Sequence, residues 1–509
     1  MLRPLLRWLS LVALAVPAGT ALWVMLARAA WPYELEWMEG AMADLVARVQ
    51  QGASLYIEPS LAFVPFIYPP LYFWLGAGLW TITGPGLPPL RCISIAAALG
   101  TTALLAWCAR RETGSRFWAV VAACLFLGSF GATGFWMDLA RVDAVALFLT
   151  AAGFVALRRS TPRGSGWLGG ILLGAAFHAK QTAALAALPM LALGWISLAA
   201  DVWLKLVVGW TAMVGLPALW GHLATQGWYT TFVLILPRLH PFEPIPPVDF
   251  LLDDLAPWVI ALMVGSSFFW YRPPNATPNN RSFHALMLVG LVGSAWLAYQ
   301  HEGSYRNVLL PAAASIALLA ALGGSALERL LQETTHPSDR PSRNAEGSPP
   351  PVHHPPWATT LEMALCIALI VQAWRLGFSP GPLIPDAVDR AEAARFVEFL
   401  RQRPGSVLLP YHGWYLTLAG KPAGAHHMAL CDVLRVARPD LRDGLLADFR
   451  ATLAGHRYDT IIVDEPWFPE VTEPSYRLEG EWAIPDERAF YPRVGMPVRP
   501  RLILVPRRR

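Results

Sequence analysis

The chain has 509 residues, of which 55% are hydrophobic and only 15% carry a charge. Soluble domains average about 25% charged residues. The composition therefore excludes an ordinary soluble protein and indicates a polytopic membrane protein. The formal net charge of +4 says little, and nothing in the sequence indicates a nucleic-acid partner.

The N-terminus begins with Arg3 and Arg7 and continues into an apolar run, 9–30. This arrangement resembles a signal peptide, but no convincing small-residue cleavage site leads into a soluble domain. We therefore expect the run to remain as the first membrane span.

The segment after this span carries three glutamates, Glu34, Glu36 and Glu39. Such a cluster is costly unless it lies at a water interface. On a helical wheel, Glu36 points away from the apolar stripe and toward water, whereas Glu39 lies at one flank, between the apolar and polar faces. Asp44 and Arg48 lie on the other flank. We expect an amphipathic helix from Glu36 to Gln51 that lies in the plane of the membrane surface.

Further apolar runs follow, each close to the length that crosses about 30 Å of hydrocarbon. With the first, they make about eleven predicted spans: 9–30, 87–108, 117–135, 139–157, 165–179, 181–199, 203–222, 256–271, 284–300, 307–326 and 357–376. Basic residues are about twice as frequent in alternate connections. The positive-inside rule then predicts a cytoplasmic N-terminus and an extracytoplasmic C-terminus in the cell inner (plasma) membrane. The sequon Asn275-Ala276-Thr277 is predicted on the inside, where it would be silent.

The last third of the chain changes composition. We predict a disordered cytoplasmic linker, 331–356, which is rich in Pro, Ser and His. After the span 357–376, residues 384–509 are expected to form a small extracytoplasmic α/β domain. Its predicted elements are helices at 391–401 and 441–453 and strands at 406–410, 458–463 and 501–505.

Cysteine and histidine patterns favour neither disulfides nor a metal site. The five cysteines do not pair or cluster. In the tail, His412, His426-His427 and Cys431-Asp432 match no familiar ligand spacing, so turns and packing explain them better. We expect no metal and no cofactor.

Several motifs in order resemble the GT-C superfamily of membrane glycosyltransferases, with a pattern nearest to the protein mannosyltransferase and aminoarabinose transferase branch (glycosyltransferase family 39-like). They are an acid soon after the first span, Tyr68-Pro69-Pro70-Leu71, Ala140-Arg141-Val142-Asp143, and a glycine-rich run from Gly169 to Lys180. The resemblance covers roughly residues 1–200 well and the remainder in architecture only. Many relatives have adjacent Asp-Glu in the first loop, whereas this chain has Met38-Glu39, with Glu36 three residues before Glu39.

The resemblance implies a fold and an activity. The fold would be an all-α GT-C-like bundle of about eleven transmembrane helices, with a catalytic module in 1–330 and a first outer loop in 31–86. The activity would be inverting transfer of a hexosyl or pentosyl group from a polyprenyl-phosphate donor to a glycan, lipid or protein acceptor at the outer face.

The chemistry requires a base and cations. A carboxylate must take the acceptor's proton, and Glu36 and Glu39 both remain candidates. The leaving lipid phosphate must meet positive charge. Asp143 is expected to be a further catalytic residue that supports or orients the acceptor or the donor. The residues expected to bind substrate or the lipid phosphate are Arg141, Lys180, Tyr305, Arg306 and Tyr68.

Two other functions stay open at this point. The chain could be a membrane transporter or a flippase of cell-envelope glycan precursors, although no matching inverted halves are evident. It could also be a non-catalytic assembly or sensory protein whose outer domain binds a partner.

Overall fold

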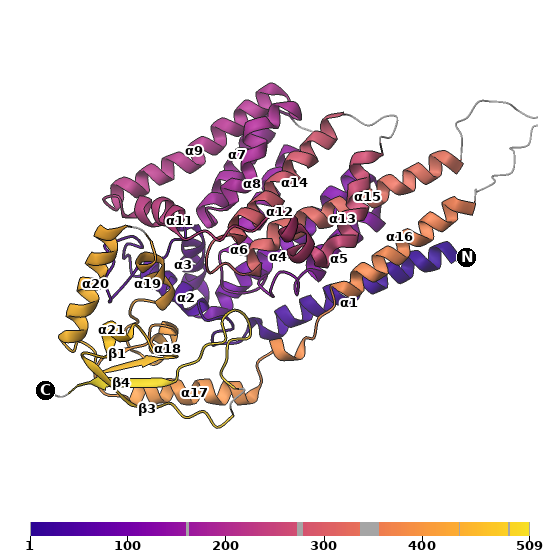
Figure 1. Ribbon diagram of the computed structural model, residues 1–509. Coiled ribbons are helices and arrows are strands. Elements are labelled where there is room, and N and C mark those ends of the chain that lie inside the picture. The colour runs from indigo at the N-terminus through magenta and orange to yellow at the C-terminus, as the bar shows by residue number, and fades with distance from the viewer. Residues whose placement is uncertain are drawn as a thin grey trace, which may run out of the picture.

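The computed structural model describes residues 2–158, 162–271, 278–335, 356–436, 438–486 and 489–507. Figure 1 shows a bundle of long helices with a smaller mixed region of helices and strands at one end. The N-terminal end of the first helix lies at the opposite end of the molecule. The sequon Asn275-Ala276-Thr277 and most of the predicted linker fall outside the described residues.

Each of the eleven predicted spans overlaps a helix. The helices are α1 (Leu2–Ala29), α4 (Leu87–Thr113), α5 (Arg116–Gly128), α6 (Asp143–Leu157), α7 (Pro162–Ala179), α8 (Ala183–Leu193), α9 (Ala200–Ala224), α13 (Val259–Trp270), α14 (Pro278–Tyr299), α15 (Leu310–Thr335) and α16 (Pro356–Arg375).

Among the described residues, five stretches are long and apolar enough to cross a membrane. They are Pro4–Ala29, Leu87–Thr113, Ala200–Ala224, Asn280–Tyr299 and Arg306–Leu331. Large apolar side chains also cover the outside of the bundle, including Trp8 at 68% exposure and Trp270 at 85%. Water disfavours such a surface and lipid accepts it, so the chain is a membrane protein. The total of eleven spans stays a prediction.

The connection between α5 and α6 differs from the prediction. Spans were expected at 117–135 and 139–157, but helix α5 ends at Gly128 and α6 begins at Asp143. Turns fill the interval, where Gly134 and Phe135 have positive φ angles of 75° and 64°. Asp143 therefore occupies the first turn of a helix rather than a position inside a span.

The first outer loop holds α2 (Glu39–Gln50) and α3 (Leu71–Thr83). The helix expected from Glu36 begins three residues later, and its place at the membrane surface stays a prediction. Helix α2 begins at Glu39, and most of its first two turns are buried. Its apolar residues Met42 and Val46 share one core with Tyr411 and Trp414 of the C-terminal part, so protein covers the helix.

Short helices and turns connect α9 to α13 and α14 to α15. They comprise α10 (Trp228–Thr230), η2 (Thr231–Ile235), α11 (Leu236–Leu239), α12 (Pro247–Asp249), η3 (Phe250–Asp254), η4 (Ala256–Trp258) and η5 (Arg306–Leu309). A bridge between Phe242 and His301 joins the two connections. Together they form part of the wall between the bundle and the C-terminal part.

The C-terminal α/β region, which we define as the described residues from 387 to 507, contains one four-stranded sheet. Its strand order is β1 (Val407–Leu408), β2 (Thr460–Val463), β4 (Leu502–Pro506), β3 (Tyr476–Glu481). Strand β1 pairs with β2 in parallel, and the other pairs are antiparallel. The helices are α17 (Ala387–Gln402), α18 (Gly413–Leu418), α19 (His427–Leu434), α20 (Pro439–Ala454) and α21 (Pro469–Thr472).

The predicted elements of this region at 391–401, 406–410, 441–453, 458–463 and 501–505 correspond to α17, β1, α20, β2 and β4. Strand β3 and the short helices α18, α19 and α21 had not been predicted. The region packs directly on the first outer loop. At Gly40 of α2, an added Cβ would lie 2.6 Å from the Trp414 Cβ, so only glycine permits this close approach.

Candidate functional site

A cavity of about 370 Å³ lies between the helix bundle and the C-terminal α/β region. Its wall comes mainly from the first outer loop, the connections between the bundle helices and α19, and Met496 near the end of the chain also lines it. Its polar lining includes Glu36, Tyr68, Arg141, Lys180, Asp432 and Arg435. This volume falls within the usual range for small-molecule sites, about 300–1,000 Å³. The cavity therefore gathers residues that lie nearly 400 positions apart in the sequence into one charged site.

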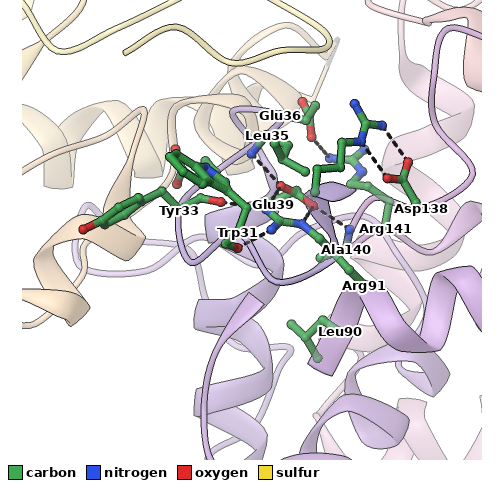
Figure 2. A network of polar contacts seen from close by, with 12 residues as sticks. Trp31, Tyr33, Leu35, Glu36, Glu39, Leu90, Arg91, Asp138, Ala140 and Arg141 are labelled. Atoms are coloured by element: carbon green, nitrogen blue, oxygen red, sulfur yellow. Dashed lines mark hydrogen bonds and ion pairs between the residues drawn. The ribbon is translucent and has the colours of Figure 1, made fainter. Parts of the chain in front are cut away.

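Glu39 does not line this cavity, and both of its carboxylate oxygens accept hydrogen bonds from the surrounding protein. Its Oε1 accepts hydrogen bonds from Arg91 Nε at 2.9 Å and from the Ala140 amide at 2.7 Å. Its Oε2 accepts from Arg91 Nη2 at 2.6 Å and from the Leu35 amide at 2.7 Å. Figure 2 shows these groups converging on the one carboxylate. The expectation that Glu39 lies where water meets lipid was wrong.

The surroundings of Glu39 hold it ionised. Burial raises the pKa of this carboxyl, but the charge and hydrogen bonds of Arg91 outweigh burial and lower the pKa below its usual value. Arg91 also donates to the main-chain carbonyls of Trp31 and Tyr33. The Glu39–Arg91 pair therefore ties the first outer loop to α4.

Glu36 lies in the cavity wall and keeps one oxygen free. Its side chain is buried, so the expectation that it faces water was wrong. Its Oε2 lies 3.3 Å from Arg141 Nη1, whereas its Oε1 has no hydrogen-bond partner. Burial raises the pKa of Glu36 to about 7, although the charge of Arg141 lowers it. A carboxyl with such a pKa exchanges protons readily near neutral pH.

A loop of the C-terminal α/β region holds Glu36 in place. Glu36 forms a bridge with Val494, and the amides of Arg493 and Val494 donate to the Leu35 carbonyl. The next residue, Gly495, has a φ of 77°, and a Cβ there would lie 3.1 Å from the Glu36 Cγ. The last part of the chain thus covers and orients the first-loop glutamate.

Arg141 connects Glu36 to the aromatic wall of the cavity. Its Nη2 donates to the Tyr68 hydroxyl at 3.0 Å. Its guanidinium also lies over the rings of Tyr68 and Trp136, at 5.6 and 5.7 Å from their centres. The Trp136 ring in turn stacks on Tyr305 at 5.6 Å. The structure therefore brings Arg141, Tyr68 and Tyr305, all singled out in the sequence, to this cavity.

Asp143 and Lys180 form an ion pair in the same wall. The Lys180 Nζ lies 2.6 Å from the Asp143 Oδ1, which also accepts from Asn307 Nδ2 at 2.8 Å. Lys180 occupies the turn between α7 and α8 and lines the main cavity. Asp143 lies one layer behind, in a smaller cavity of about 40 Å³ that shares Lys180 and Asn307 with it. The two sequence motifs that end in these residues thus meet.

Arg306 is not brought to this cavity, contrary to its expected place beside Arg141 and Lys180. It begins η5, is exposed, and does not belong to the lining residues. Arg435, which directly follows α19, contributes a cation to the lining instead, with its Nη1 3.8 Å from Glu302 Oε1. No local pattern indicated Arg435, because only the packing of α19 over the bundle places it there.

Buried polar atoms without a partner concentrate around the cavity. They include Glu36 Oε1, Trp136 Nε1, Arg141 Nε, Gln181 Oε1, His240 Nε2 and Asp432 Oδ1, and all six residues line it. Leaving a buried donor or acceptor unsatisfied costs about 1–3 kcal/mol each. Such a concentration at one place favours a polar ligand that completes these hydrogen bonds.

The third glutamate of the cluster has a different place again. Glu34 Oε2 lies 2.5 Å from His412 Nδ1, and His412 Nε2 lies 2.8 Å from Asp464 Oδ2. Burial lowers the pKa of His412, but the two carboxylates raise it to about 10. Glu34 was expected to be an interfacial or capping charge. It instead joins the first outer loop to the C-terminal α/β region.

The histidines and cysteine of the tail do not come together as a metal site. Within the described ranges, no group of three or more His, Cys, Asp or Glu side chains is placed to hold a metal ion.

The fold matches solved structures over nearly its whole length. ArnT from Cupriavidus metallidurans matches with a TM-score of 0.59 when bound to undecaprenyl phosphate and 0.60 in the apo state. Both matches have 12% identity and cover 96% of this chain and 97% of that chain.

Two further structures share the fold. The apo Archaeoglobus fulgidus oligosaccharyltransferase matches with a TM-score of 0.52 and 11% identity, over 89% of this chain and 69% of that chain. The arabinofuranosyltransferase AftD from Mycobacteria matches with a TM-score of 0.51 and 15% identity, over 97% of this chain and 41% of that chain. No protein-family profile matches the sequence, and no curated protein matches it.

All of these structures are GT-C glycosyltransferases, and the chain has the GT-C fold. The resemblance found in the sequence motifs is therefore confirmed at the level of the fold.

Proposed function

We propose that this chain is a membrane glycosyltransferase that transfers a hexosyl or pentosyl group from a polyprenyl-phosphate donor to an acceptor. One observation carries the proposal. A buried carboxyl with a free oxygen, that of Glu36, shares a cavity with the cations Arg141 and Lys180. Sugar transfer from a lipid phosphate requires a base and positive charge within one site.

In this proposal Glu36 is the general base. The acceptor hydroxyl attacks the anomeric carbon and gives its proton to Glu36 Oε1. The new carbon–oxygen bond forms as the bond from the anomeric carbon to the phosphate oxygen breaks, so the configuration inverts. A pKa of about 7 supports this role, because a base works best when its pKa lies near the working pH.

Arg141 and Lys180 receive the charge of the leaving phosphate. Arg141 Nε has no partner, and Lys180 has three ammonium hydrogens of which Asp143 takes one. A lipid phosphate can therefore bind without displacing either ion pair. Asp143 is a positioning residue, since it holds Lys180 and Asn307 in the wall. Glu39 is a structural residue, because Arg91 donates a hydrogen bond to each of its two carboxylate oxygens.

The proposed reaction takes place at the extracytoplasmic face of the inner (plasma) membrane. The cavity lies beside the first outer loop and the C-terminal α/β region, and the distribution of basic residues predicts that both are outside. The matched ArnT structure that contains undecaprenyl phosphate is consistent with a polyprenyl-phosphate donor here. The acceptor would be a glycan, a lipid or a protein.

The purified full chain in lipid vesicles provides the test. It is incubated with a panel of undecaprenyl-phosphate sugars, and released undecaprenyl phosphate is measured, with water as a slow acceptor. We expect release from at least one donor and at least a tenfold loss in Lys180→Met, because one charged contact to phosphate contributes about 1.5–3 kcal/mol. Lys205→Met is the matched control, since Lys205 pairs with the exposed Asp201 on α9.

Two results would contradict the proposal. One is release that does not change in Lys180→Met. The other is movement of intact lipid-linked sugar across the vesicle membrane without any release, which would indicate a flippase.

A further inference from the structure

Helix α19 and His240 present a pair of unsatisfied polar atoms to the cavity. Asp432 Oδ1 and His240 Nε2 lie 3.6 Å apart, and neither has a hydrogen-bond partner. Their side chains are only 2% and 6% exposed, so water does not freely solvate them. Both residues line the main cavity, on the side of the C-terminal α/β region.

Their neighbours on α19 differ, because their polar groups already have partners. His427 Nδ1 accepts from Trp467 Nε1 at 3.1 Å, and its Nε2 lies 3.4 Å from the Cys431 sulfur. Arg435 donates to the Cys431 carbonyl at 3.2 Å and faces Glu302. Within this part of the wall, Asp432 and His240 are therefore the groups to which a ligand could supply the missing hydrogen bonds.

The geometry of the pair indicates the kind of ligand group. A separation of 3.6 Å is too long for a hydrogen bond between Asp432 and His240. A hydroxyl group can donate its one hydrogen to the carboxylate while its oxygen accepts from the imidazole. It therefore fits beside both atoms when His240 carries its hydrogen on Nε2.

The local charge favours a neutral hydroxyl over an ammonium group. Burial lowers the pKa of His240 to about 4, and the positive charges of Arg435 and His301 lower it as well. His240 is therefore uncharged at neutral pH. Burial raises the pKa of the neighbouring Asp432 to about 7, so this carboxyl would balance a cationic ligand only in part, whereas a neutral hydroxyl needs no such balance.

We propose that Asp432 and His240 bind a hydroxyl group of the donor sugar and thereby determine which sugars the enzyme accepts. The inference rests on the proposed function, in which the lipid phosphate is met by Arg141 and Lys180. Every donor then brings a sugar ring into the same cavity. The two residues bind substrate in this proposal and take no part in proton transfer.

Binding of lipids with and without a sugar tests the inference. The purified full chain is titrated with undecaprenyl phosphate and with undecaprenyl-phosphate-linked glucose, mannose, galactose and arabinose. We expect the wild type to bind at least one glycosylated lipid more tightly than undecaprenyl phosphate. Asp432→Asn should lose about tenfold or more for that lipid, as expected for a hydrogen bond to a charged group, and should bind undecaprenyl phosphate as before.

Two further variants keep the test decisive. His240→Gln should show the same selective loss, and it replaces Asp432→Asn if that variant does not fold. Asp440→Asn is the matched control, because Asp440 lies exposed on α20 and pairs only with Arg438 among the described residues. It should bind every lipid as the wild type does.

The outcomes separate the two proposals. Equal losses for glycosylated and sugar-free lipid in both variants, or no loss in either, would overturn the role of Asp432 and His240 alone. Tight wild-type binding of undecaprenyl phosphate without preference for any glycosylated lipid would also overturn it alone. A wild type that binds none of these lipids would overturn the proposed function together with this inference.

Discussion

Glu36 and Glu39 lie three residues apart, but their surroundings differ completely. Glu39 accepts four hydrogen bonds, two of them from Arg91, and lies outside the cavity. Glu36 has one long contact to Arg141 and one oxygen without a partner, and it lines the cavity. Both carboxylates are buried, so burial alone does not distinguish a structural acid from a reactive one. The two acids differ in the number of carboxylate acceptor positions that have no hydrogen-bond donor.

The pKa values follow the same division. Full pairing lowers the pKa of Glu39, whereas burial with partial pairing raises that of Glu36 to about 7. A fully paired carboxylate cannot accept a proton without breaking its hydrogen bonds. We therefore assign a structural role to Glu39 and the role of general base to Glu36.

Glu36→Gln should give the largest effect. The amide has the shape of the carboxyl but cannot accept the acceptor's proton, so release of undecaprenyl phosphate should fall about 10²- to 10⁴-fold. The thermal unfolding temperature should stay close to that of the wild type. Glu481→Gln, at an exposed pair with Arg501, is the control and should retain full activity. Activity above one tenth of the wild type in Glu36→Gln would exclude it as the base.

Glu39→Gln should mainly lower the free energy of unfolding. It leaves the buried Arg91 guanidinium without its counterion, which costs about 3–5 kcal/mol of unfolding free energy. Unfolding of the purified chain in detergent measures the loss. Glu398→Gln, whose partner Arg401 is exposed, should cost only about 0–1 kcal/mol. A stable Glu39→Gln protein that is as inactive as Glu36→Gln would reverse our assignment of the two acids.

The pH dependence of the reaction should report Glu36. The base acts when it is deprotonated, and its raised pKa of about 7 places this change near neutral pH. The rate should therefore fall as pH decreases below about 7, by about tenfold per pH unit. The residual rate of Glu36→Gln should not show this decrease at low pH. A wild-type rate that stays constant down to pH 5 would fit an acid with a lowered pKa, such as Glu39, and not Glu36.

Asp143→Asn should give a smaller effect. The amide keeps the contact to Asn307 but removes the charge that holds Lys180, so phosphate binding should weaken by about 5- to 20-fold. Asp201→Asn, at the exposed Lys205 pair, provides the control for loss of an Asp–Lys pair. Titration with undecaprenyl phosphate measures both. An unchanged affinity in Asp143→Asn would show that Lys180 needs no positioning by this acid.

Local patterns in the sequence predicted much of this fold. Each of the eleven predicted apolar runs overlaps a helix. The motif that ends in Lys180 contacts the motif that ends in Asp143 through the ion pair of these two residues. These features depend on hydrophobic periodicity and on the order of motifs, both of which are local. The same is true of the strands β1, β2 and β4, which are short β-branched runs between turns.

The roles of the glutamates could not be predicted in this way. Glu39 is neutralised by Arg91, 52 residues later, inside the predicted span 87–108. Glu36 is covered by the Val494–Gly495 loop near the end of the chain. The wheel placed both acids at a membrane surface, because nothing local indicates that the C-terminal α/β region packs there. Asp432 and Arg435 enter the cavity for the same long-range reason.

A structure of the full chain with bound polyprenyl phosphate would test the central claim most directly. We expect the phosphate within about 3–3.5 Å of Lys180 or Arg141, with space for one sugar ring between it and Glu36. A phosphate bound away from this cavity, or one paired with Arg91 in place of Glu39, would contradict it.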